Sequence, residues 1–234
     1  MTLLAVPTAL IAVVLFVRDV GDWVNRGTFE VVELSADGSQ AITGNLSGGE
    51  GPDQEVDVHA TVLTVTLMNN SEDLKVFDRI TVRTEDFVPV TECVDGVGGP
   101  ISVTASYEID LPAQGEESHS DISYALEPKK AEALQLPVGS GEADSGVALI
   151  RITLHESGGD TEEVGSIAVL TSPGVGELYP RPLHRLPVAG MPSPRCVHDT
   201  RDALAELVED APVVADSVRT LTEDVGVTSQ ELGG

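Results

Sequence analysis

Aromatic side chains and positive charges are both scarce in this chain. Phe, Trp and Tyr make up 3% of the 234 residues, and 13 Lys and Arg stand against 39 Asp and Glu, a formal net charge of −26. Nucleic-acid binding relies on clustered Lys and Arg at the phosphates and on aromatic rings that stack on bases. The composition therefore argues against a protein that binds nucleic acid, and the lack of aromatic platforms argues against sugar binding.

The acidity predicts solubility rather than a particular partner. A globule of this length exposes roughly 10,000 Å² of surface, so the net charges lie about 20 Å apart on average. That spacing exceeds the Debye length of about 8 Å at physiological salt, so most of the average repulsion is screened. The hydrophobic fraction of 41% is sufficient for a sizeable core.

Motifs for catalysis and cofactor binding are also missing. The chain contains no G-x-G-x-x-G, P-loop, H-E-x-x-H or C-x-x-C pattern. Ser118, His119 and Asp121 have the residue types of a hydrolase triad, but they are neighbours in a predicted polar loop. The acidic residues 53–59 are interpreted as solvated surface rather than as a calcium site. We therefore predict a non-enzymatic protein without catalytic residues, cofactor or metal; an enzyme whose site is assembled from distant residues is the alternative.

The N-terminus carries one long apolar run. Residues 3–17 read LLAVPTALIAVVLFV, which as a helix spans about 22 Å and can be extended towards Trp23 to cross a membrane. A signal peptide would have a basic start and a small-residue cleavage site, and neither is present. We predict a single-pass transmembrane anchor within residues 1–27, with a signal peptide or a buried core helix as alternatives.

The orientation of this anchor is ambiguous. Arg18 and Arg26 follow the apolar run, and the positive-inside rule then places the following domain in the cytoplasm. A short anchor followed by a β-domain is nevertheless usually an exported arrangement. We predict a domain outside the cytoplasm at the cell membrane and keep the opposite orientation open.

The middle of the chain has the alternating pattern of β-strands. Residues 101–111 alternate cleanly between apolar and polar side chains, which predicts a half-buried strand. Residues 56–68 also alternate, but the apolar positions change from even to odd near Val62, which predicts a bulge or burial on both faces. Further strands are expected at residues 28–34, 75–84, 121–127, 131–136, 147–155 and 162–171. Short strands separated by polar turns indicate an antiparallel sandwich.

Two stretches resemble a known class of domain. Residues 64–90, TVTLMNNSEDLKVFDRITVRTEDFVPV, are followed by Cys93 and then by SYEIDLP at residues 106–112. This pattern is similar to Ig-like sandwich domains of uncharacterised bacterial membrane-anchored proteins, in which a polar N-N-S-type turn links two strands and a Tyr-containing strand ends at Leu-Pro. The resemblance implies an Ig-like sandwich over residues 28–172 and no defined site. The Cys–Trp–Cys arrangement of antibody domains is absent, because the only Trp precedes the sandwich.

Cys93 and Cys196 are the only cysteines. In an exported domain they are candidates for a disulfide, which would close a loop of about 100 residues and stabilise the fold by up to about 4.7 kcal/mol. In the cytoplasm they would remain thiols, so the pair also reports on orientation. The sequences at residues 45–47 and 69–71 match the N-glycosylation sequon, a match that is common by chance.

A proline-rich segment separates the sandwich from the end of the chain. Residues 173–197 contain six prolines and several arginines, which predicts an extended linker. Two alternatives are a basic strap across an acidic face of the sandwich and a ligand for a proline-recognising domain.

Residues 198–234 show helical spacing. Apolar residues recur in steps of three and four, which predicts a heptad seam, a candidate interaction surface made of Leu204, Leu207, Ala211, Val214, Val218, Leu221 and Val225. Asp210 as an N-cap and Pro212 in a first turn predict two short amphipathic helices. The seam either docks on its own domain or binds a partner.

Together these features predict a mainly β, membrane-tethered, Ig-like domain that presents loops or its helical tail to a protein partner. The alternative is a cytoplasm-facing accessory subunit that associates through the heptad seam.

Overall fold

The computed structural model describes residues 29–47, 54–90, 93, 102–105, 109–139, 146–171 and 192–233, and for residues 37–47, 54–59 and 102–105 it describes the backbone alone. The predicted anchor at residues 1–27, its membrane run at residues 3–17 and most of the predicted linker lie outside these ranges. Within the described ranges, no helix combines the length and the apolar character needed to cross a membrane.

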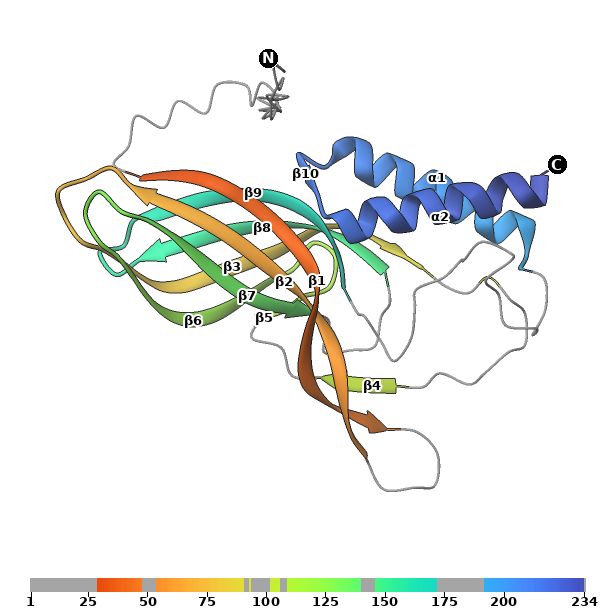
Figure 1. Ribbon diagram of the computed structural model, residues 1–234, viewed down its shortest axis with the longest axis horizontal. Helices are drawn as coiled ribbons and strands as arrows, with labels where there is room; N and C mark the ends of the chain where they lie inside the picture. The colour runs from red at the N-terminus through yellow and green to blue at the C-terminus, as the bar shows by residue number, and fades with distance from the viewer. Residues whose placement is uncertain are drawn as a thin grey trace, which may run out of the picture.

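The described strands form two five-stranded sheets (Figure 1). The first sheet has the order β4 (Ser102–Ala105), β1 (Phe29–Ser47), β2 (Gln54–Asn69), β7 (Ala131–Gly139) and β5 (Ile109–Asp110). The second has the order β10 (Val213–Val214), β9 (Thr161–Leu170), β8 (Gly146–Glu156), β3 (Lys75–Pro89) and β6 (Glu117–Leu126). Neighbouring strands are antiparallel except for the two-residue pairings β5–β7 and β10–β9, which are parallel.

One hydrophobic core lies between the elements of both sheets. It is built by alternation, since every second residue of a strand points to the same side. On β2 the odd positions from Leu63 to Leu67 are fully buried, and on β3 and β8 the even positions Ile80, Val82, Ile152 and Leu154 are buried. The structure is thus mainly β, with a core shared by the two sheets.

The predicted switch of apolar positions from even to odd in residues 56–68 lies beside a bulge on the neighbouring strand β1. Gly38 of β1 pairs with Thr61, but the next paired residue, Gln40, faces Ala60, so β1 carries one extra residue at this point. Consecutive residues Ala60 and Thr61 of β2 are both buried. The Thr61 hydroxyl donates a hydrogen bond to the Leu170 carbonyl oxygen of the other sheet at 2.9 Å, which satisfies the polar group in the core.

Two of the predicted strand boundaries are wrong. Residues 101–111 contain two short strands at opposite edges of the first sheet, because Ala105 of β4 pairs with β1 whereas Ile109 of β5 pairs with β7. The predicted loop at residues 112–120 ends early, because β6 already begins at Glu117. This polar segment forms an edge strand that pairs with β3 alone.

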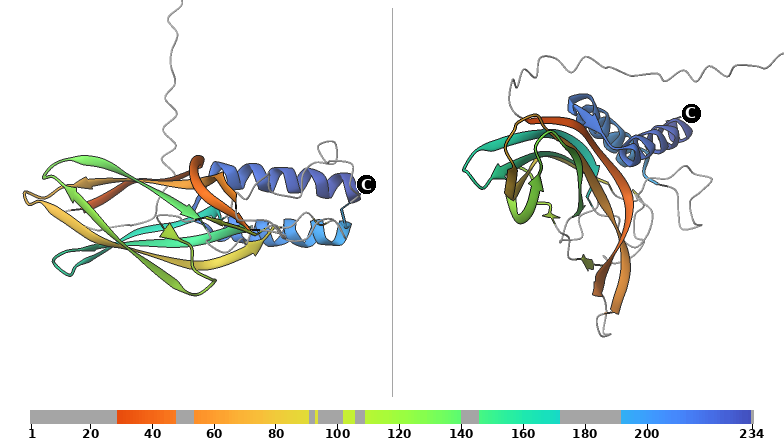
Figure 2. Two further views of the ribbon diagram at one scale, coloured as in Figure 1. Left: turned by 90° about the horizontal axis from the view of Figure 1, so that it is seen from below. Right: turned by 60° about the vertical axis from the view of Figure 1, so that its left-hand side comes forward.

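Two helices follow the sheets, α1 (Pro194–Asp210) and α2 (Asp216–Gly233). They lie side by side and extend past one end of the sheets (Figures 1 and 2). The predicted linker therefore ends before Pro194 rather than at residue 197: Ser193 caps α1, and Pro194 stands in its first turn, where a missing N–H costs little. The second helix begins at Asp216 rather than near Pro212, because residues 213–214 pair with β9 as strand β10.

The heptad seam packs inside the molecule. Of its seven residues, Ala211 is partly buried and packed against the core, and the other six are buried in it: Leu204, Leu207, Val214, Val218, Leu221 and Val225. Of the two readings left open above, the structure shows the seam docked on its own domain. The seam residues are therefore not exposed on the described helices.

A disulfide joins Cys196 in the first turn of α1 to Cys93, which lies four residues after the end of β3. Cys93 and Cys196 are 103 residues apart in sequence, and their sulfur atoms are bonded with the Cα atoms 5.6 Å apart. Cys93 has a left-handed backbone with φ of 58°, and its carbonyl oxygen accepts a hydrogen bond from the Ser193 N–H at 2.7 Å. The bond thus joins Cys93, which follows β3 in the chain, to the first turn of α1.

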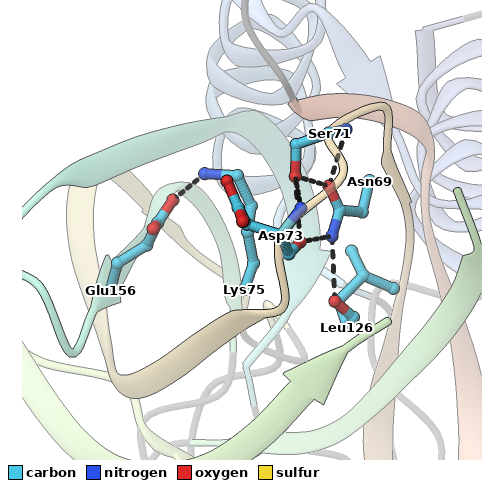
Figure 3. Close-up of polar contacts among 6 residues, drawn as sticks. All are labelled: Asn69, Ser71, Asp73, Lys75, Leu126 and Glu156. Atoms are coloured by element: carbon cyan, nitrogen blue, oxygen red, sulfur yellow. Dashed lines mark hydrogen bonds and ion pairs between the residues drawn. The ribbon is translucent and has the colours of Figure 1, made fainter. Parts of the chain in front are cut away.

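The turn between β2 and β3 is organised by the buried side chain of Asn69 (Figure 3). Its amide group donates to the carbonyl oxygens of Asp73 at 2.8 Å and Leu126 at 3.0 Å. Its oxygen accepts from the Ser71 N–H at 2.9 Å and from the Ser71 hydroxyl at 2.6 Å. Because every hydrogen-bonding position of the amide is used, the sequon at residues 69–71 offers no reactive amide in the folded chain. Figure 3 also shows the Lys75–Glu156 ion pair, which links β3 to the end of β8.

Replacing this amide tests its role in the fold. Asn69→Ala removes the hydrogen bonds of the amide to the backbone of Ser71, Asp73 and Leu126, the last of which is buried, so we expect a loss of about 2–3 kcal/mol in the free energy of unfolding, measured by urea denaturation. The matched control is Asn70→Ala, whose amide makes one exposed contact with Glu30 at 3.4 Å and should change stability by less than about 0.5 kcal/mol. Equal losses in the two variants would contradict this account of the turn.

Candidate functional site

The outer side of the second sheet carries most of the chemistry of the described residues. Four neighbouring strands, β6, β3, β8 and β9, present side chains there, and the register places Thr81 of β3 between His119 of β6 and Thr153 of β8. We call this surface the arginine face; it comprises Arg79, Thr81, Arg83, Glu85, Glu117, His119, Asp121, Arg151, Thr153, His155, Glu163 and Ser166.

The arginines of this face are held by carboxylates. Arg151 contacts Glu85 at 2.6 Å and Glu163 at 3.7 Å, and the Ser166 hydroxyl donates to the second oxygen of Glu85 at 2.9 Å. Arg83 contacts Glu117 at 3.6 Å. Arg79 and Asp121, at 4.0 Å, form the loosest pair. Exposed pairs of this kind contribute at most about 1 kcal/mol each, so their main effect is to fix the directions of the guanidinium groups.

A depression of about 340 Å³ lies at the centre of the face. Two threonines, two arginines and two carboxylates line it: Thr81, Thr153, Arg83, Arg151, Glu85 and Glu117. Every lining residue is polar or charged. The depression therefore suits a charged or hydrogen-bonding group rather than an apolar ligand.

Two imidazole rings converge on one hydroxyl beside this depression. The Thr81 oxygen lies 2.9 Å from His119 Nδ1 and 2.7 Å from His155 Nε2. A hydroxyl has one proton, so Thr81 donates to at most one of the two rings and accepts from the other. We call these three residues the histidine notch. Thr81 is 9% exposed, whereas His119 is exposed, so solvent reaches the notch from the side of His119.

The triad-like residues of the sequence are separated by strand alternation. Ser118 is turned to the opposite side of β6 from His119, and its buried hydroxyl has no hydrogen-bond partner among the described residues. His119 bonds to Thr81, and Asp121 faces Arg79. These residues therefore make no Ser–His–Asp relay in the structure.

The acidic residues considered for calcium are likewise dispersed. The side chains of residues 53–59 lie outside the described part of the chain, Glu117 is paired with Arg83, and Asp160 stands in the turn after β8. In the described ranges, no cluster of three or more His, Cys, Asp or Glu side chains is placed to hold a metal ion.

The arginine face was missed at the sequence level, although a signal is present. Residues 79–83 read RITVR and residues 151–155 read RITLH. The register sets the two segments against each other, with Arg79 opposite His155, Thr81 opposite Thr153 and Arg83 opposite Arg151. The repeated R-x-T-x pattern could have indicated two strands with a shared polar side, but only their pairing brings the residues together.

Tyr124 of β6 is the one described group whose protonation is clearly shifted. Its ring stacks beside Phe77 with the centroids 6.2 Å apart, and its buried hydroxyl lacks a partner among the described residues. Burial, and to a lesser degree the negative charge of Glu132, raises the pKa of the Tyr124 phenol above its ordinary value. The hydroxyl lies towards the core rather than on the arginine face.

This shift predicts a loss of stability in alkali. The folded chain holds the Tyr124 proton more tightly than the unfolded chain, so stability falls as the pH rises above the ordinary tyrosine pKa of about 10. Absorbance at the tyrosinate band, taken as the difference between the wild type and Tyr124→Phe, should show a midpoint above that value. Tyr124→Phe should also weaken the alkaline loss of stability; a midpoint at or below 10 would refute the burial of the hydroxyl.

Comparison with known proteins shows that no family model, no curated protein and no solved structure matches the chain. The resemblance to Ig-like domains accordingly rests on the strand and turn pattern of residues 28–173.

Proposed function

We propose that the chain is a non-enzymatic, Ig-like β-sandwich domain, tethered to the membrane through residues 3–17 and placed outside the cytoplasm, that binds a protein partner through the arginine face. The observation that carries the binding role is the arginine face itself. Three arginines and four carboxylates gather there on a chain whose net charge is −26.

This pattern fits a protein surface better than a uniformly charged ligand. A strongly cationic partner would be repelled by the arginines, and a polyanion would be repelled by the carboxylates and by the chain as a whole. A protein surface can offer carboxylates to Arg83 and Arg151 and cationic side chains to Glu85 and Glu117. Because ion pairs already orient the guanidinium groups, less side-chain freedom is lost on binding. Arginine is also enriched at interfaces.

The disulfide supports the location. Disulfides persist in secreted proteins and at cell surfaces, and they are rare in the reducing cytosol. Cys93 and Cys196 are joined in the structure, which favours the exported orientation over the one indicated by Arg18 and Arg26.

The location is tested by reporters fused after Gly234 and by thiol labelling. We expect activity from a reporter that works only outside the cytoplasm and no labelled thiol in the denatured, unreduced chain. The Cys93→Ser/Cys196→Ser variant should lose up to about 4.7 kcal/mol of stability. An active cytoplasmic reporter together with two labelled thiols would overturn the proposed location. The binding role of the arginine face has its own experiment.

The binding role is tested by photo-crosslinking in intact cells. A crosslinking residue placed at Arg79 or Glu163 of the arginine face should give the same adduct, whereas the matched positions Thr66 and Gln135 on the first sheet should not. Arg83→Glu should abolish the adduct formed from Glu163, because it sets three like charges around the depression. Adducts of equal yield from both sheets, or from neither, would contradict the proposal.

A further inference from the structure

We propose that the depression on the arginine face binds one carboxylate group of the protein partner, and that Arg83 and Arg151 share this group between them. The inference rests on the proposed function, because it names the chemical group that the partner supplies. It assigns that group to one place, the space between the two guanidinium groups.

These two arginines are a directly opposed pair of like charges. The register sets Arg83 of β3 opposite Arg151 of β8. Among the described strand pairings no other two like charges stand opposite each other, although the chain has 39 Asp and Glu against 13 Lys and Arg. Like charges directly opposite each other destabilise a sheet. A negative group placed between the two arginines removes this repulsion.

The row of residues that crosses the strands here has a gap in its alternation of charge. Glu117 of β6 pairs with Arg83, and Arg151 pairs with Ser166 of β9. Because the two arginines pair with each other, the order across the row is negative, positive, positive, neutral. A carboxylate over the two arginines restores the alternation, and each of its oxygens accepts from one guanidinium group.

Both arginines have donor groups to spare. Arg83 contacts Glu117 at 3.6 Å, which exceeds the usual N–H···O distance of about 2.7–3.2 Å. Arg151 contacts Glu85 at 2.6 Å and Glu163 at 3.7 Å. A guanidinium group carries five N–H donors, and the two side chains are 51% and 45% exposed. Each arginine can therefore donate to a further acceptor that arrives from solvent.

The carboxylates of the lining flank the two arginines. Both oxygens of Glu85 are engaged, one by Arg151 and the other by the Ser166 hydroxyl at 2.9 Å. Glu117 lies on the edge strand β6 with its side chain 47% exposed, so it can turn to solvent when a partner carboxylate arrives. This movement limits the repulsion between the two carboxylates, and one exposed ion pair is exchanged for another.

A single carboxylate fits this place better than a phosphate or a sulfate. Glu85 and Glu117 already balance part of the positive charge of the two arginines. A group with two negative charges is repelled more strongly by these carboxylates and by a chain of net charge −26. The remaining capacity of the arginines thus suits a group that carries one negative charge and two acceptor oxygens.

The test places an amine at the depression. A carbodiimide joins a lysine amine to a carboxylate in contact with it, with loss of water. The chain has only three lysines, all beside the β2–β3 and β6–β7 turns: Lys75, Lys129 and Lys130. The variant Arg83→Lys/Glu117→Gln keeps a cation at the depression and removes the carboxylate that faces it within the chain.

Membranes containing this full-length variant are treated with the carbodiimide. We expect an amide between position 83 and a carboxylate of the same protein that photo-crosslinks at Arg79 and Glu163. Mass spectrometry of the joined peptides shows whether an Asp or Glu side chain or a C-terminal carboxylate supplies the group. The matched control is Arg79→Lys/Asp121→Asn, in which the new amine faces His155 rather than an arginine; its coupling should be at least about fivefold weaker.

A second measurement does not need the lysine variant. Arg83→Gln and Arg151→Gln should each lower the yield of the photo-adduct formed from Arg79 by about two- to fivefold. The double variant should lose less than the product of the two, because both arginines serve the same group. Thermal unfolding of each variant shows that the fold is retained.

A partner that photo-crosslinks but gives no amide at position 83, or gives equal amounts at positions 83 and 79, would overturn this inference and leave the proposed binding role standing. Independent losses in Arg83→Gln and Arg151→Gln would show that the arginines do not share one group, and would overturn it as well. Absence of both the photo-adduct and the amide would overturn the inference together with the binding role.

Discussion

The pairing of β3 with β8 is the interaction on which the rest of the structure depends. Ile80, Val82, Ile152 and Leu154 face the core from these two strands and are almost fully buried. A slip of one residue would bring polar residues into the core and expose these side chains, so burial fixes the register. The same register decides what the other side of the sheet presents. Irregularities in the pairing next to Phe77 and Thr84 bound the regular segment, and the arginine face is built on that segment.

The two helices α1 and α2 pack against the same hydrophobic core as the sheets. Strand β10 pairs with Ile167 and Ala168 and so occupies part of the outer edge of β9, and an exposed sheet edge is a template for unwanted pairing. The apolar stripe of the helices packs against the core, and the disulfide joins the first turn of α1 to Cys93, four residues after the end of β3. The side chains that the helices expose are mostly polar, apart from Val227 of α2, which is 43% exposed. For this reason the outer side of the second sheet, and not the tail, is the surface on which we base the proposed function.

The sequence predicted those elements whose pattern is local, and it failed where the pairing of distant strands determines the structure. Residues 75–84, 147–155 and 162–171 fall in strands because each alternates or is densely apolar; the observed β3 and β8 extend the first two, and β9 is shifted by one residue from the third. The clean alternation of residues 101–111 predicts strand structure, but it cannot show that Ala105 and Ile109 pair at opposite edges of a sheet. The heptad spacing located the apolar stripe of the tail without showing what covers it. The histidine notch was beyond reach, because His119, Thr81 and His155 meet only through two ladders between strands far apart in the sequence.

The ion pairs of the arginine face also engage the carboxylates that lie among its histidines. Hard cations such as Ca²⁺ need several converging oxygens, and the nearby carboxylates that could supply them are directed towards Arg79, Arg83 and Arg151 instead. The two imidazole rings of the notch are hydrogen-bonded to the Thr81 hydroxyl, so His119 of β6 and His155 of β8 are each joined to the central strand β3. The side chains of the arginine face therefore link neighbouring strands of the second sheet in pairs, and the same contacts set which charges and hydrogen-bonding groups this surface presents.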